Sequence, residues 1–186
     1  MAANDPTSSN TTAPPAALLP EEELRKRAII AKQVAASFGE IVTLLLRSPG
    51  DRKRPLEDLE RMVVPALQTG QFAVAEAQSK ENGMVIPAGA VLWAMVSADV
   101  DRRLSQNLDQ PMRLEPQDWR SGSIPWIVAA FGDTKIVGGL LQQLAASVFK
   151  SEPAKMRARG ADGKPFVGRM ELATENAAKA QPPPVG

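Results

Sequence analysis

The sequence contains no histidine, no cysteine and no tyrosine among its 186 residues. Without histidine or cysteine, the chain has no Ser-His or Cys-His nucleophile pair and no thiol redox chemistry. The common zinc sites also lose their ligands, which leaves only carboxylate and carbonyl oxygens for a metal, and we expect no metal site. General acid–base chemistry is therefore left to aspartate, glutamate or lysine side chains.

An excess of charge of one sign is also missing, because 22 Lys and Arg residues nearly balance 21 Asp and Glu residues. A net charge of +1 gives no reason to expect a nucleic acid or an anionic membrane as a partner. The apolar stretch from Ala88 to Val96 is too short to cross a bilayer. The N-terminus lacks the basic and apolar regions of a secretory signal. We therefore expect a cytoplasmic protein without a membrane span.

Both ends of the chain lack a periodic apolar pattern. Residues 2–19 are rich in Ala, Pro, Ser, Thr and Asn, and the C-terminus closes with a run of prolines. Such segments cannot bury enough apolar surface to offset the entropy lost on ordering. We predict disordered tails at residues 1–20 and 173–186 on either side of a single domain of residues 21–172.

A long helix is predicted at the start of this domain. Apolar residues recur at steps of three and four from Leu24 to Leu45, which places them on one stripe facing a core. The segment Ser48-Pro49-Gly50 ends this pattern. A second helix is expected from Leu56 to about Leu67, with Pro65 marking a kink or an early end.

Strands and further helices follow in a mixed order. We expect strands at Gln71–Ala77, Ala90–Val96, Ile124–Phe131 and Pro165–Leu172, the last at a sheet edge. Ser97 is a candidate N-cap for a third helix, and Ile136–Phe149 fits a fourth. Residues 106–122 read as a long polar loop, and the scattered charges from Lys150 to Lys164 as a flexible segment. This order indicates one mixed α/β domain.

Several short motifs occur in a recognisable order. They are Phe38-Gly39-Glu40-Ile41, Ser48-Pro49, Val64-Pro65-Ala66-Leu67, Gln71-Phe72, Val91-Leu92-Trp93-Ala94, Glu115-Pro116-Gln117-Asp118-Trp119-Arg120-Ser121-Gly122 and Ala130-Phe131-Gly132-Asp133. With these motifs the chain resembles the toxin-activating lysine acyltransferases, which fatty-acylate internal lysines of RTX protoxins. The likeness covers about residues 32–150, and the Asp-Trp-Arg-Ser-Gly run followed by Phe-Gly-Asp is its most specific part. The resemblance implies a GNAT-like mixed sheet flanked by helices.

The resemblance also implies a reaction and its partners. The family moves an acyl chain from acyl carrier protein to a lysine amine of an RTX-type protein, with no bound cofactor. Its catalytic histidine follows the glycine of the first motif, where this chain has Glu40. A second family residue, an aspartate on the strand before Phe-Gly, aligns with Trp126 by ungapped counting or with Ala129 by local pattern. The chain is therefore either an acyltransferase with Glu40 as its base or a catalytically silent relative that binds a partner protein or an acyl chain.

Glu40 allows two interpretations from the residues around it. Burial beside the apolar stripe strengthens a carboxylate as a base, which would suit it to deprotonate a lysine ammonium. Alternatively, Glu40 lies at the helix edge, where it is solvated or paired with Lys32 or Arg47.

Two further groups are candidates for binding the acyl substrate. The turn at Gly132 and Asp133 would offer backbone N–H groups to an oxyanion or a phosphate, or it is a simple capped turn. Trp119 lies in the polar loop and is a candidate interface and acyl-binding residue. Trp93 and Trp126 lie on apolar strands and fit the core better than an acyl channel.

Two surface features bear on protein partners. The basic cluster Arg52-Lys53-Arg54 would dock an acidic carrier protein by charge, or it is a solvated loop. An exposed apolar strip along Ile136–Phe149 would indicate a homodimer.

Overall fold

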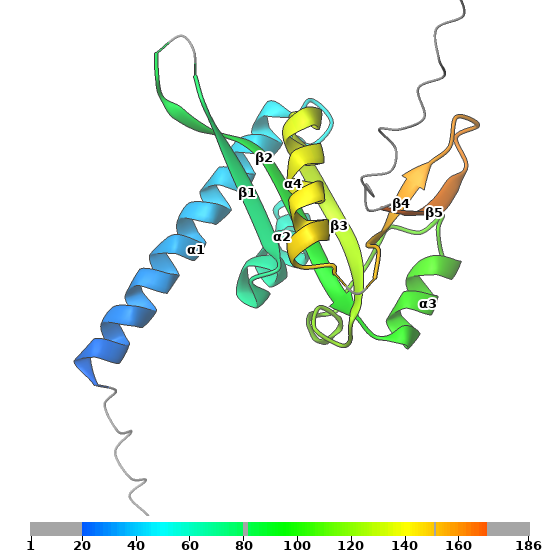
Figure 1. The fold of residues 1–186 in the computed structure, drawn as a ribbon, viewed down its shortest axis with the longest axis horizontal. Helices are drawn as coiled ribbons and strands as arrows, with labels where there is room; N and C mark the ends of the chain where they lie inside the picture. The colour runs from blue at the N-terminus through cyan, green and yellow to red at the C-terminus, as the bar shows by residue number, and fades with distance from the viewer. Residues whose placement is uncertain (1–19, 80–81, 151, 171–186) are drawn as a thin grey trace, which may run out of the picture.

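A five-stranded sheet forms the centre of the computed structural model, which describes residues 20–79, 82–150 and 152–170 (Figure 1). The strands are β1 Phe72–Gln78, β2 Val85–Val96, β3 Ile124–Gly132, β4 Lys155–Arg159 and β5 Pro165–Arg169, and they lie in this order across the sheet. Neighbouring strands are antiparallel, except that β3 and β4 run parallel. This mixed sheet with its helices confirms the expected GNAT-like α/β class. Apart from Pro20, the tails predicted at residues 1–20 and 173–186 lie outside the described residues.

Helices cover both faces of the sheet (Figure 1). They are α1 Glu21–Arg47, α2 Leu56–Thr69, α3 Ala98–Gln106, the short 3-10 helix η1 Pro116–Asp118 and α4 Thr134–Ser147. On one face, Ile41 of α1 and Val63 of α2 share a core with Leu92 of β2. On the other face, Leu144 of α4 shares a second core with Val91 of β2. Consecutive residues of β2 face opposite layers, which explains why the centre of this strand is apolar throughout.

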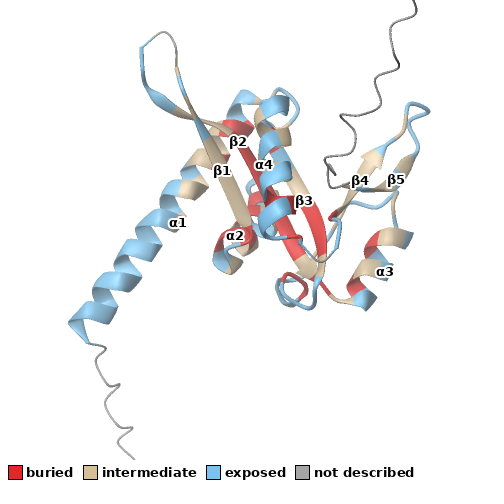
Figure 2. Cartoon of the chain, in the orientation of Figure 1, coloured by how far each residue is buried: buried red, intermediate tan, exposed pale blue. Residues whose placement is uncertain are grey.

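The N-terminal half of α1 extends beyond the sheet (Figure 2). Leu44 and Leu45 near the C-terminal end are buried, whereas Leu24 and Ile30 are 51% and 58% exposed. By length and composition alone α1 is able to cross a membrane, since an 18-residue window has a mean hydropathy of 1.6. One such helix is weak evidence for a membrane span, because buried core helices and signal sequences pass the same test; 17% of this window is buried.

The second helix continues through Pro65 rather than ending there. It reaches Thr69, whose Oγ1 donates a hydrogen bond of 2.7 Å to the carbonyl oxygen of Pro65. Gly70 then ends the helix in the left-handed conformation, with φ at 65°. The proline lies so near the C-terminal end that only the final turn follows it, and this turn has its own side-chain and glycine caps.

The sequence did not predict β4, which lies in the segment interpreted as flexible. Its basic residues are structural: Lys155 Nζ lies 2.7 Å from Oδ1 of Asp101, and Arg157 donates hydrogen bonds to the carbonyl oxygens of Leu104 and Gln110. The partners of these charges belong to α3 and the loop after it, far away in the sequence. The strand β4 was therefore missed because its alternating basic residues resemble solvated charges in the sequence. By contrast, β5 confirms the predicted edge strand over Pro165–Arg169, while residues 171 and 172 of that prediction lie outside the described residues.

The apolar stripe of α4 packs on the sheet through Val137, Leu140 and Leu144. Among the large apolar residues from 136 to 149, all of which the structure describes, only Val148 is exposed. A continuous exposed strip along Ile136–Phe149 is therefore not present. The homodimer stays a prediction.

Candidate functional site

A cavity of about 370 Å³ opens between the middle of α1 and the junction of α2 with β1. Side chains of α1 form one side, the end of α2 and the first residue of β1 form the other, and a residue of the long loop completes the wall. The lining residues are Ile30, Gln33, Val34, Ser37, Leu67, Gln68, Thr69, Gly70, Phe72 and Arg120. The guanidinium of Arg120 donates a hydrogen bond to the carbonyl oxygen of Thr69, which fastens the loop to the end of α2.

Three of the motifs that carry the resemblance line this cavity, and a fourth begins directly after its lining residue Ser37. Ser37 directly precedes the Phe-Gly-Glu-Ile motif, and Leu67 is the last residue of Val-Pro-Ala-Leu. Phe72 belongs to the Gln-Phe pair, and Arg120 belongs to the Asp-Trp-Arg-Ser-Gly run. Sequence analysis identified these motifs but missed Gln33, Ser37 and the cavity itself, because the crossing of α1 over the α2–β1 junction is a tertiary feature.

Glu40 lies one helical turn from this cavity. Gln33, Ser37 and Glu40 follow at steps of four and three, so they lie along one face of α1. Glu40 is half-buried, and it has no hydrogen-bond or ion-pair partner within the part of the chain that the structure describes. Arg47 instead donates a hydrogen bond of 3.1 Å to the carbonyl oxygen of Pro87, and Lys32 makes no ion pair with Glu40. Among the described residues the carboxylate is therefore unpaired, and no polar side chain there orients it.

The turn between β3 and α4 is fixed by Gly132. Its φ is 105°, and a Cβ at this position would lie 2.3 Å from the carbonyl oxygen of Ala88. Only glycine fits such an approach. The N–H of Asp133 donates a hydrogen bond of 2.9 Å to the same carbonyl oxygen, while Arg47 reaches the preceding residue, Pro87. The end of α1 and the β3–α4 turn therefore contact the same short stretch of β2.

Asp133 caps the N-terminus of α4 with its own side chain. Its Oδ1 accepts hydrogen bonds of 2.9 and 3.2 Å from the N–H groups of Lys135 and Ile136. A carboxylate thus occupies the donors that a phosphate would need, so the geometry favours the capped turn over a phosphate site. A role of this turn near a reacting carbonyl stays a prediction.

The loop between α1 and α2 carries the basic cluster, whose three side chains are exposed. Within this loop, Asp51 accepts hydrogen bonds of 2.7 Å from both Ser48 Oγ and Arg54 Nε. Burial by itself raises the pKa of the Asp51 carboxyl, but these two hydrogen bonds and the charge of Arg54 outweigh burial and lower the pKa below its ordinary value. Arg54 is thereby paired, so Arg52 and Lys53 are the members of the cluster without an acidic partner among the described residues.

The tryptophans lie in the core. Trp93 and Trp126 are buried, which confirms the core interpretation. Trp119 is wholly buried as well, so the expectation of an interface residue is wrong: its loop packs along β2, where the Trp119 carbonyl oxygen accepts a hydrogen bond of 3.0 Å from the Met95 N–H. Its acyl-binding role stays a prediction. Of the two positions matched to the family aspartate, Trp126 is fully buried and Ala129 half-buried, and neither supplies a carboxylate.

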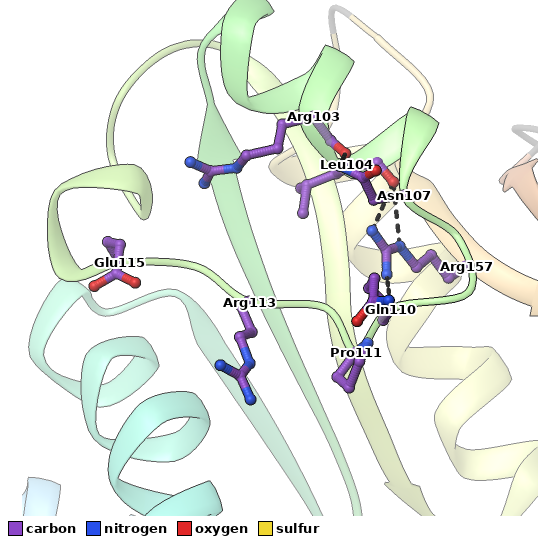
Figure 3. A pocket seen from close by; sticks show the side chains of 8 residues that line it. All are labelled: Arg103, Leu104, Asn107, Gln110, Pro111, Arg113, Glu115 and Arg157. Carbon is purple, nitrogen blue, oxygen red and sulfur yellow. Dashed lines mark hydrogen bonds between the residues drawn. The ribbon is translucent and has the colours of Figure 1, made fainter.

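A second cavity, of about 270 Å³, lies between α3, the loop after it and β4 (Figure 3). Arg103, Arg113 and Arg157 line it, but two of these cations are already engaged. Arg103 pairs with Asp118, and Arg157 holds backbone carbonyls of α3 and the loop. Burial lowers the pKa of the Arg157 guanidinium. The arginines at this cavity mainly fasten the long loop, and Glu115 is its only residue from the motifs.

Comparison with known proteins gives concordant matches. The model of the RTX toxin acyltransferase family matches residues 30–166. A leukotoxin-activating lysine-acyltransferase, LktC, from a Pasteurella haemolytica-like species is 28% identical over 103 residues, which cover 54% of this chain and 57% of LktC. The lysine-acyltransferase RtxC of Vibrio cholerae is 29% identical over 103 residues, covering 54% and 62% of the two chains. The RTX-I toxin-activating lysine-acyltransferase ApxIC of Actinobacillus pleuropneumoniae is 31% identical over 100 residues, covering 52% and 53%.

Proposed function

Because the chain belongs to the RTX toxin acyltransferase family, we propose that it transfers a fatty acyl group from an acyl carrier protein to a lysine side chain of an RTX-type protein. The matched relatives bear the names of lysine-acyltransferases, and the chain spans 53% to 62% of their lengths. The observation that carries the proposal is the meeting of three family-like motifs at one cavity, whose α1 lining ends directly before a fourth motif and one helical turn from Glu40.

The proposed reaction exchanges one acyl bond for another. The lysine ammonium first loses a proton, and its nitrogen attacks the carbonyl carbon of the thioester. The carbon–sulfur bond then breaks as the amide forms, and the nitrogen loses a second proton, which the carrier's thiolate takes up. Because the thioester is already activated, the protein has to orient two substrates and accept one proton, which requires no resident cofactor.

Glu40 is the proposed proton acceptor. By the resemblance it takes the position of the family's base, it is half-buried, and no described cation or N–H group occupies its oxygens. The arriving lysine ammonium would therefore be its ion partner before becoming its proton donor. The substrate-binding surfaces of the two protein partners would close over the carboxylate and exclude water from it.

A second candidate function is a catalytically silent relative that retains the cleft and binds an acyl group or a partner protein. The unoriented carboxylate of Glu40 favours this alternative, since catalytic bases are ordinarily held by a neighbouring polar group. The matched positions Trp126 and Ala129 favour it too, because neither carries an acid.

One experiment separates the two candidates. The full chain is incubated with acyl-loaded carrier protein and an RTX-type acceptor, and acyl-lysine is measured by mass spectrometry. We expect transfer by the native chain, a loss of about a hundredfold or more in Glu40→Gln, and native rates in the control Glu60→Gln, which alters an exposed glutamate of α2. Carrier binding without transfer would establish the silent relative. Equal transfer by Glu40→Gln and the native chain would remove Glu40 from the mechanism.

A further inference from the structure

The cavity beside Glu40 follows the axis of α1. Its α1 lining begins at Ile30 and ends at Ser37, and Glu40 lies one turn further along the same face. With a rise of about 1.5 Å per residue, the ten steps from Ile30 to Glu40 span ~15 Å. A linear ligand laid along this face would thus run from the candidate base to the exposed half of the helix.

Apolar side chains lie on both sides of such a ligand, among the polar lining residues Gln33, Gln68 and Thr69. Val34 of α1 and Phe72 of β1 are half-buried and pack against the main core, so contacts with the core fix their positions. Leu67 is buried at the end of α2. Apolar walls with a few fixed polar groups are typical of sites for small apolar ligands. Arg120, which is the one charged side chain among the described lining residues, donates a hydrogen bond to the Thr69 carbonyl oxygen.

The two ends of the cavity differ in character. At one end Ser37 and the neighbouring Glu40 provide polar atoms, whereas at the other end Ile30 is apolar and 58% exposed. A ligand with a polar reacting head and an unbranched apolar tail matches this polarity. Because the Ile30 end lies at the surface, no described side chain closes the cavity against the end of a long tail.

We propose that this cavity holds the unbranched acyl chain of the donor, with its carbonyl end at Ser37 and its tail running past Val34 and Phe72 toward Ile30. The inference rests on the proposed function for the identity of the ligand. A longer acyl chain makes more apolar contact along the α1 face until its tail leaves the cavity at Ile30. The site therefore favours long acyl chains over short ones.

A labelling experiment tests the cavity without any need for catalysis. Because the chain has no cysteine, Ser37→Cys introduces a single thiol at the polar end of the cavity. The probes are alkyl methanethiosulfonates carrying methyl, octyl and hexadecyl groups, and the control is Ser105→Cys, a half-buried serine of α3 outside this cavity. We expect the ratio of hexadecyl to methyl labelling rates to be at least about tenfold higher for Ser37→Cys than for the control. Equal ratios in the two variants would overturn the proposal.

A second experiment blocks the middle of the cavity. Gln33→Trp places a bulky ring on the lining at an exposed helix position that tolerates substitution, and Ile29→Trp is its control, 57% exposed and outside the lining. With octanoyl and hexadecanoyl carrier protein as donors, we expect Gln33→Trp to lower the preference for hexadecanoyl at least about tenfold, and Ile29→Trp to leave it unchanged. An unchanged preference in a fully active Gln33→Trp would place the acyl chain elsewhere.

The two experiments distinguish failure of this inference from failure of the proposed function. Length-dependent labelling of Ser37→Cys without transfer by the native chain would refute the enzyme and support an acyl-binding relative. Transfer by the native chain together with length-independent labelling would support the enzyme and refute the acyl cavity.

Discussion

The indole Nε1 of Trp126 donates a hydrogen bond of 2.8 Å to Oδ1 of Asp101. The same carboxylate accepts hydrogen bonds of 2.7 and 2.8 Å from Nζ of Lys155. Because Trp126 belongs to β3, Asp101 to α3 and Lys155 to β4, one carboxylate joins three elements that are far apart in the sequence. The side chains of Asp101 and Lys155 are each only 17% exposed, so each charge relies on the other for compensation.

Asp101→Ala should therefore be strongly destabilising. It leaves the Lys155 ammonium partly buried without its counter-charge and removes the partner of the Trp126 indole, and we expect a loss of about 3 kcal/mol in the free energy of unfolding. The control is Asp99→Ala on the same helix, whose side chain is 87% exposed and which should cost less than about 1 kcal/mol. Urea denaturation followed by tryptophan fluorescence measures both. Similar losses in the two variants would contradict this account.

The hydrogen bonds to Asp51 predict a pH dependence. The folded-state pKa of its carboxyl is lowered from an ordinary 3.8, so the charged form stabilises the fold above that pH, and this contribution is lost as the pH falls through the folded-state pKa. We expect Asp51→Asn to lower the free energy of unfolding by about 1 kcal/mol at neutral pH and to cost progressively less as the pH falls below 3.8. The control is Asp109→Asn, an exposed residue of the long loop. A difference from the native chain that does not change with pH would argue against these hydrogen bonds.

The helices and the central strands were predictable because their signal is local. The stripe from Leu24 to Leu45 and the apolar run of β2 each reflect the period of one element packed on a core. The N-cap at Ser97 is equally local, and its Oγ accepts a hydrogen bond from the Val100 N–H. The motif order around Glu40 also sufficed to identify the family, since it depends on residue identities and not on packing.

The features that sequence analysis missed all depend on contacts between distant segments. Lys155 in β4 reads as a solvated charge until Asp101 of α3 is placed beside it. Trp119 reads as exposed because its neighbours in the loop are polar, yet the loop lies along the edge of β2 and buries it. The cavity is of the same kind, since Gln33 and Ser37 are ordinary polar positions on α1 until the α2–β1 junction crosses them.

The exposed basic residues of the α1–α2 loop allow a prediction about the affinity for the proposed acyl carrier protein. Acyl carrier proteins are acidic, and Arg52 and Lys53 are the cluster residues without a described acidic partner. We expect the double variant Arg52→Glu/Lys53→Glu to weaken binding of the carrier about tenfold at low salt, with a smaller effect at high salt because exposed charges are screened. Isothermal titration at two salt concentrations measures this. Lys164→Glu, at an 84% exposed position in the β4–β5 hairpin, serves as the control. An equal loss in that control would point to net charge rather than to a docking loop.

A substitution at Gly132 tests whether the β3–α4 turn contributes only to the stability of the fold or also to acyl transfer. A Cβ at this position would lie 2.3 Å from the Ala88 carbonyl oxygen, and the φ of 105° disfavours any other residue. We therefore expect Gly132→Ala to cost about 2–3 kcal/mol in the free energy of unfolding.

Gly138→Ala is the matched control for this variant. Gly138 lies in α4, and a Cβ added there would meet no neighbouring side chain within 4 Å, so alanine should stabilise the helix by about 0.5–1 kcal/mol.

Gly132→Ala should also affect the candidate site. Asp133 and Arg47 both donate hydrogen bonds to the start of β2, at Ala88 and Pro87 respectively. Moving the turn away from Ala88 in this variant should therefore shift the part of β2 that the end of α1 contacts. If the turn lies near the reacting carbonyl, acyl transfer by Gly132→Ala should fall even under conditions where the variant remains folded. Native transfer rates in folded Gly132→Ala would restrict the turn to a structural role.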